Sequence, residues 1–131
     1  MKKKLSKISV LLVLMLTLAV CFAFGASAET DVYECGANGA NVIGTYDYET
    51  QILTISGEGD MMDYGGENGY GPFSLWQGET YKIKSIIIED GITRIGDYCF
   101  WTTNGTESIT IPDSVTSIGE RAFWSCDRFL W

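Results

Sequence analysis

The sequence predicts a mainly β fold, in which a small β-hairpin cap is followed by a short solenoid of two 23-residue coils. A 16-residue segment recurs 23 residues further along the chain, which is typical of stacked repeats. Within that segment apolar residues alternate with a period of two, as they do along a strand. After residue 28, no stretch shows the 3.6-residue period of a helix longer than one or two turns.

The repeat occupies residues 86–101 and 109–124, which are identical at eight of 16 aligned positions. In each copy, an Ile-x-Ile pair places two isoleucines on one face of a strand, and a later isoleucine and a phenylalanine also point inward. Paired strands lie about 4.8 Å apart, so like side chains should stack into a continuous core. The predicted repeat core consists of Ile86, Ile88, Ile95, Phe100, Ile109, Ile111, Ile118 and Phe123.

Gly96 and Gly119 occupy the same repeat position and predict a bend or a positive φ. The period of 23 lies within the range of about 20–29 residues found in leucine-rich repeats. A solenoid of this kind usually needs at least about three repeats, so we expect the cap to act as a neighbour at one end. The other end, around Ile109–Ile111 and the C-terminal Phe129–Trp131, should stay open and favour self-association.

We expect three regions in the chain, namely a signal peptide over residues 1–28, a β-rich cap over 29–80 and the two coils over 81–131. In the cap, Gly44–Tyr48 and Thr50–Ser56 resemble two strands of a hairpin with its turn near Asp47–Thr50. Residues 57–72 contain six glycines and Pro72, and they predict a loop.

The N-terminus has the three parts of an export signal. Four lysines within the first seven residues precede an apolar run from Ile8 to Phe24, and Ala26-Ser27-Ala28 provides small residues for cleavage. Cleavage after Ala28 is the prediction, with a retained membrane anchor or a lipoprotein as the alternatives. The mature protein should therefore be secreted or held at the cell surface, with the membrane involved only through the cleaved segment.

The charge of the mature chain disfavours nucleic-acid partners. It keeps all 17 acidic residues and only five of the nine basic ones, for a formal charge of −12. Such a charge repels phosphate backbones and anionic lipid.

Catalysis and cofactor binding are not expected. The chain contains no histidine, which removes Ser-His-Asp and Cys-His pairs, and it has no phosphate-binding glycine loop. No cofactor or metal site is predicted. The mature chain has three cysteines, Cys35, Cys99 and Cys126, which leaves open one disulfide plus a free thiol or three buried thiols.

Three tryptophans are the candidate ligand contacts. Trp101 and Trp124 occupy equivalent repeat positions, so they should lie near each other on one face of the solenoid. Trp76 could extend this surface. Adjacent flat aromatic rings suit a sugar or the centre of a protein interface, and the alternative is packing beneath the loop that joins two coils.

The segment Ile109–Cys126, I-T-I-P-D-S-V-T-S-I-G-E-R-A-F-W-S-C, resembles the repeat of the BspA-like leucine-rich-repeat surface proteins. Cys35-Gly36, the stretch I-L-T-I-S-G-E-G-D-M at Ile52–Met61, and Trp76 resemble the cap that often precedes those repeats. The resemblance implies a bacterial surface or secreted protein that adheres to a host or bacterial surface protein or to polysaccharide. Alternatives are a carbohydrate-binding module that uses an aromatic face, or a truncated gene fragment without independent function.

Overall fold

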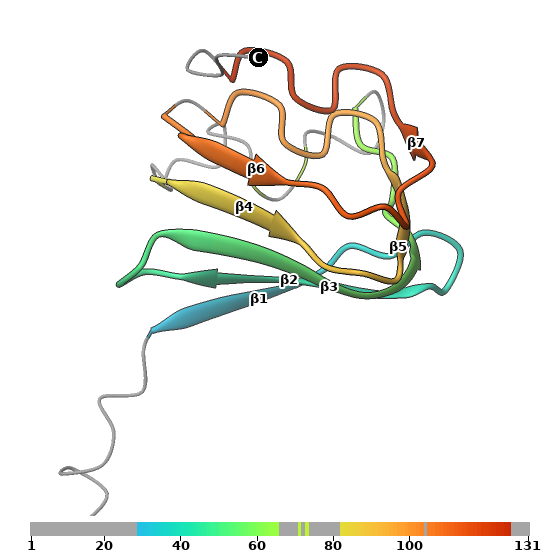
Figure 1. Ribbon diagram of the computed structural model, residues 1–131, viewed down its shortest axis with the longest axis horizontal. Coiled ribbons are helices and arrows are strands. Elements are labelled where there is room, and N and C mark those ends of the chain that lie inside the picture. The colour runs from blue at the N-terminus through green and yellow to red at the C-terminus, as the bar shows by residue number, and fades with distance from the viewer. Residues whose placement is uncertain (1–28, 66–70, 72, 74–81, 104, 127–131) are drawn as a thin grey trace, which may run out of the picture.

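The computed structural model describes residues 29–65, 71, 73, 82–103 and 105–126. Its strands are β1 (Thr30–Glu34), β2 (Asn41–Asp47), β3 (Ile52–Asp60), β4 (Ser85–Ile88), β5 (Ile92–Ile95), β6 (Ser108–Thr110) and β7 (Ser117–Ile118). β1, β2 and β3 form an antiparallel meander, to which β4 and β6 add in parallel. β5 and β7 line a second side of the molecule, where β5 pairs with the far end of β3 (Figure 1). The described residues therefore form the predicted mainly β, open repeat fold.

The two repeat segments lie directly beside one another. Ile86 pairs with Ile109 between β4 and β6, and Ile95 pairs with Ile118 between β5 and β7. Both pairings are parallel and both keep the 23-residue offset of the sequence repeat. The prediction that these segments are successive coils in register is confirmed.

The ladder continues from the first coil into the cap. Leu53 on β3 pairs with Ile86, and both side chains are fully buried. Further along, the backbone N–H of Met61 donates to the carbonyl of Arg94 (3.0 Å), and Met61 is also fully buried. The cap thus places an irregular coil against the first repeat and covers the apolar side chains at that end.

The glycine-rich segment begins as strand, which corrects the predicted loop from residue 57. β3 runs through Gly57 to Asp60 and forms the corner between the two sides of the molecule. Gly57 has a φ of 117°, and a Cβ there would lie 1.8 Å from the carbonyl oxygen of Asn41 on β2. Only glycine permits this φ and this close approach of two backbones.

β1 is a further difference from the prediction, which placed no strand at Thr30–Glu34. None of its five residues is buried, and Val32 is 62% exposed. β1 is held by its backbone pairing with β2. Its sequence therefore lacks the alternation of apolar and polar residues that would have predicted a strand.

Three phenylalanine rings form a stack inside the solenoid. The Phe73 and Phe100 ring centroids are 5.8 Å apart, and those of Phe100 and Phe123 are 5.3 Å apart. Tyr33 of β1 packs edge-on against Phe73. Because each coil and the cap contribute one ring, the stack joins them into one core.

Glycine is needed at positions 96 and 119 because the preceding coil passes close to them, and not because of a positive φ. A Cβ on Gly96 would lie 2.0 Å from the carbonyl oxygen of Met62, and one on Gly119 would lie 2.2 Å from Oδ1 of Asp97. Neither glycine is among the residues with positive φ. The preceding coil passes so near each of them that no larger residue fits.

The burial of the predicted repeat core differs between the coils. Ile86, Ile88, Ile95 and Phe100 in the first coil are buried. In the second coil, Ile109 and Phe123 are partly buried, whereas Ile111 and Ile118 are 41% and 53% exposed. The expectation of a buried core is therefore wrong for Ile111 and Ile118, because among the described residues only one side of this coil has a neighbour. Self-association through this surface stays a prediction.

The predicted signal peptide, residues 1–28, lies outside the described residues. Within the described ranges, no helix is long and apolar enough to cross a membrane.

Candidate functional site

Trp101 and Trp124 are positioned by a turn that recurs in both coils. Tyr98 begins the turn in the first coil and Arg121 in the second, with φ values of 54° and 52°. The N–H of Trp101 donates to the carbonyl of Tyr98 (3.3 Å). The N–H of Trp124 donates in the same way to the carbonyl of Arg121 (3.2 Å). The repeated sequence therefore produces a repeated local geometry, in spite of two non-glycine residues with positive φ.

The two turns are hydrogen-bonded to one another at the tryptophans. The N–H of Phe100 donates to the carbonyl of Ala122, and that of Thr102 donates to the carbonyl of Trp124, both at 2.8 Å. These bonds lie on either side of Trp101, so Trp101 and Trp124 are on neighbouring coils at the same level. Trp124 is 58% exposed, and Trp101 is partly buried.

Arg121 adds a cation to this surface. Its guanidinium carbon lies 5.5 Å from the ring centroid of Trp124 and 5.8 Å from that of Tyr98. Nη1 of Arg121 also donates to the Tyr98 hydroxyl (2.9 Å). Cation–π contacts at these distances hold the guanidinium over the rings, since both rings present a negative face. We call Tyr98, Trp101, Arg121 and Trp124 the Trp–Arg face.

Arg121 and Tyr98 were not among the residues selected from the sequence. Tyr98 and Arg121 stand at equivalent repeat positions, each three residues before a tryptophan. This shared spacing is the sequence feature from which both residues could have been assigned to the site. The third predicted contact, Trp76, lies outside the described residues. The assignment of Trp76, Trp101 and Trp124 as ligand contacts stays a prediction.

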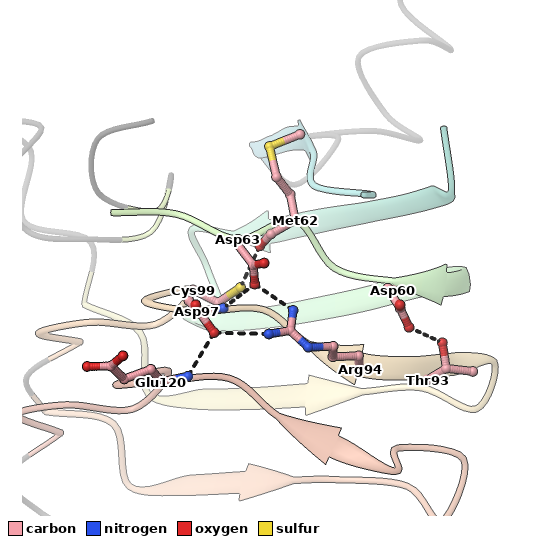
Figure 2. A network of polar contacts seen from close by, with 8 residues as sticks. All are labelled: Asp60, Met62, Asp63, Thr93, Arg94, Asp97, Cys99 and Glu120. Atoms are coloured by element: carbon pink, nitrogen blue, oxygen red, sulfur yellow. Dashed lines mark hydrogen bonds and ion pairs between the residues drawn. The ribbon is translucent and has the colours of Figure 1, made fainter. Parts of the chain in front are cut away.

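A ladder of carboxylates braces the coils on the side where β5 and β7 end (Figure 2). Oδ1 of Asp63 accepts a hydrogen bond from the backbone N–H of Asp97 (2.8 Å), and Oδ1 of Asp97 accepts one from the N–H of Glu120 (2.8 Å). Arg94 bridges the two carboxylates, with Nη1 2.5 Å from Asp63 and Nη2 3.0 Å from Asp97. The ladder connects the cap and both coils, and it ends beside Arg121 of the Trp–Arg face.

The electrostatics of the ladder follow from these contacts. The backbone N–H of Asp97 and then the Arg94 guanidinium hold the pKa of Asp63 below its usual value. Asp63 in turn raises the pKa of Arg94. Both shifts stabilise the charged forms, so the ladder suits a structural brace more than proton transfer.

The cap contains a pocket whose lining has few side chains that could act in catalysis. It has a volume of about 400 Å³ and is lined by Glu34, Gly36, Gly39, Ala40, Asn41, Val42, Ile43 and Met62. Glu34 is the one carboxylate in that lining. Over the described part of the chain, no three Cys, Asp or Glu side chains gather as a metal site requires.

In-register parallel coils, joined by ladders of isoleucine and phenylalanine and covered at one end by a β meander, form a solenoid of stacked repeats, the architecture that includes the leucine-rich repeats. Residues 76–130 match the family model described as "BspA type Leucine rich repeat region (6 copies)". This part of the chain is therefore a leucine-rich-repeat region of the BspA type, and the resemblance seen in the sequence is confirmed.

A solved bacterial structure supports the same assignment. The chain is similar to a leucine-rich repeat protein from Eubacterium ventriosum, with 28% sequence identity and a TM-score of 0.60. The match covers 74% of this chain and 24% of that protein, so this chain spans about a quarter of the neighbour's length. The comparison with curated proteins gave no match.

Proposed function

We propose that this chain is an exported, non-catalytic binding module of the bacterial surface, which adheres to its partner through the Trp–Arg face. Leucine-rich repeats of this type are associated with protein–protein interaction, and the repeat assignment supports that class of function. The observation that carries the proposal is the 58% exposure of Trp124 beneath the Arg121 guanidinium. A large exposed indole with a fixed cation beside it is typical of the centre of a protein interface.

The partner that these features favour is a surface protein of the host or of another bacterium. Nucleic acid is disfavoured by the formal charge of −12 that the chain has after cleavage at Ala28. The absence of histidine from the sequence and the structural role of the Asp63–Arg94 pair support a function without catalysis.

A panel of immobilised extracellular-matrix and bacterial surface proteins tests the proposal. We expect Trp124→Ala to weaken binding at least tenfold, as truncation of a central interface residue does. Tyr48→Ala is the matched control, because Tyr48 is an aromatic residue of the cap with 41% exposure. Equal binding by wild type and Trp124→Ala would remove the Trp–Arg face from the proposal.

Carbohydrate recognition is the second candidate function. It is favoured by two indoles on neighbouring coils at the same level, since flat aromatic rings can stack on sugar rings. A glycan array with wild type, Trp101→Ala, Trp124→Ala and the control Tyr48→Ala separates the two candidates. Glycan binding that is lost in Trp101→Ala and Trp124→Ala, without binding to the protein panel, would select the carbohydrate function.

Export is tested separately from binding. N-terminal sequencing of the protein recovered from the growth medium or the cell surface should begin at Glu29. A protein that retains its first residues would contradict cleavage after Ala28 but would leave the binding test unaffected.

A further inference from the structure

The second coil ends the described part of the fold with two strand edges that have no further neighbour. Among the described residues, β6 pairs with β4 alone and β7 pairs with β5 alone. In the first coil, the carbonyl of Ile95 accepts a hydrogen bond from the N–H of Gly119 in the second coil (2.7 Å). The equivalent carbonyl, that of Ile118, therefore points away from the first coil, so this end can accept another strand.

Apolar side chains lie uncovered beside these edges. Ile88 and Ile95 in the first coil are 2% and 0% exposed, whereas their counterparts Ile111 and Ile118 are 41% and 53% exposed. Both coils have isoleucine at these positions, so the exposure comes from the lack of a neighbour among the described residues. Exposed apolar side chains beside strand edges mark an interaction surface. We call β6, β7 and the corner between them, residues 111–116, the open edge.

The opposite edge of the main sheet is built differently. That edge is β1, which carries Asp31 and Glu34, and charged side chains discourage pairing at strand edges. β6 and β7 consist only of serine, isoleucine and threonine. Pairing of the open edge with β1 of a second copy is therefore disfavoured, and with it a filament of copies joined head to tail.

The shape of the open edge favours one occupant. β6 and β7 lie on two different sides of the molecule (Figure 1), so an extended peptide could pair with only one of them. A second copy of the chain presents the same two strands and the same corner. A two-fold rotation about the line that bisects the corner places β6 of each copy antiparallel to β7 of the other.

The pairing that results is matched residue by residue. Thr110 and Ser117 adjoin the corner on its two sides, so Thr110 comes to lie opposite Ser117 of the second copy. One step further from the corner, Ile109 comes to lie opposite Ile118 of the second copy. Polar side chains thus face polar ones, apolar side chains face apolar ones, and the exposed isoleucines of both copies are covered.

We propose that two copies of this chain form a closed two-fold dimer through their open edges. The proposal goes beyond the proposed binding function and does not use the Trp–Arg face. The formal charge of −12 on each chain after cleavage at Ala28 opposes the association. Salt screens this repulsion, so the dimer should become tighter as the salt concentration rises. A basic peptide at the same edge would instead bind more weakly at high salt.

Sedimentation of the protein expressed from the full chain tests the proposal. We expect a monomer–dimer equilibrium without larger species, and a dimer dissociation constant that falls with added salt. Ile118→Glu should raise that constant at least about tenfold, because it places a charge in the covered apolar surface. Val32→Glu is the matched control, since it makes the same change at a 62% exposed residue of β1 and should leave the constant unchanged.

Ile111→Glu is a second variant at the open edge and should act like Ile118→Glu, and circular dichroism checks that all variants remain folded. A monomer at every concentration and salt condition overturns the proposal. Growth of filaments, or equal association by wild type and a folded Ile118→Glu, also overturns it.

Cross-linking tests the geometry of the dimer. Thr110→Cys and Ser117→Cys are made separately in a chain that also carries Cys21→Ser and Cys126→Ala, so that the remaining cysteines, Cys35 and Cys99, are fully buried. With oxidised glutathione, a mixture of the two variants should give a disulfide-linked dimer, and neither variant alone should do so. A mixture without the cross-link, or a cross-link formed equally by one variant alone, overturns the two-fold about the corner.

Discussion

Phe100 and Phe123, which are 23 residues apart, stack with their ring centroids separated by 5.3 Å and their planes inclined by 11°. This contact follows from the sequence repeat, because each coil places a phenylalanine ring at the equivalent position and the two rings stack. Phe73 extends the stack into the cap, although it belongs to no repeat in the sequence. Phe100 is therefore enclosed on both sides, whereas among the described residues Phe123 has a ring neighbour on one side.

This asymmetry predicts unequal losses of stability. Phe100→Ala should lower the free energy of unfolding by about 3–5 kcal/mol, since it removes a fully buried ring and leaves a cavity. Phe123→Ala is the control and should cost clearly less, because that ring is partly exposed. Urea denaturation followed by fluorescence measures both, and equal losses would contradict the stack described here.

Substitution of Gly96 in the first coil by alanine should destabilise the protein. In Gly96→Ala the new Cβ would meet a backbone oxygen, Met62 O, which can move only if the cap moves. We expect a loss of about 2–3 kcal/mol in the free energy of unfolding. Gly105→Ala has no atom within 4 Å of its Cβ but a φ of 93°, so it should cost about 1 kcal/mol from backbone strain alone. A smaller loss in Gly96→Ala than in Gly105→Ala would contradict the close approach.

The carboxylate ladder predicts a dependence of stability on pH. The pKa of Asp63 in the folded protein is below its unfolded value of about 3.9, so its ionised form stabilises the fold above that pH. This contribution is lost as the pH falls through the folded pKa. Asp63→Asn should therefore be less stable than wild type at pH 7, by less than about 1 kcal/mol because the pair is largely solvated.

The difference between wild type and Asp63→Asn should close as the pH falls below about 4. Thermal unfolding at pH 3, 5 and 7 measures it. Asp113→Asn serves as a control substitution at an exposed carboxylate of the second coil that takes no part in the ladder. A gap for Asp63→Asn that widens towards pH 3 would exclude the ladder as its cause.

The cap should unfold together with the coils. Leu53→Ala removes a fully buried side chain that pairs with Ile86, and it should cost about 2–5 kcal/mol. Val32→Ala, at an exposed position of β1, should cost under about 0.5 kcal/mol. Unfolding of Leu53→Ala should show a single transition in both far-UV circular dichroism and tryptophan fluorescence. Two separate transitions would mean that the cap and the coils are independent units.

The sequence by itself determined the stacking of the coils. Identical residues 23 positions apart can share one buried face only if the segments lie in register, and the pairing of Ile86 with Ile109 follows from that. The hairpin of the cap was also evident, because alternating apolar residues border a short turn.

Tertiary structure decided the features that depend on contacts between unlike segments. The burial of Ile118 depends on whether a neighbour covers it, and no property of its own repeat reports that. The strand conformation at Gly57 depends on the close passage of β2, so composition alone suggested a loop. The stacking of Phe73 on Phe100 arises where the irregular cap meets the first coil. A sequence repeat specifies only how equivalent residues of successive coils contact one another. The remaining contacts form only in the complete fold.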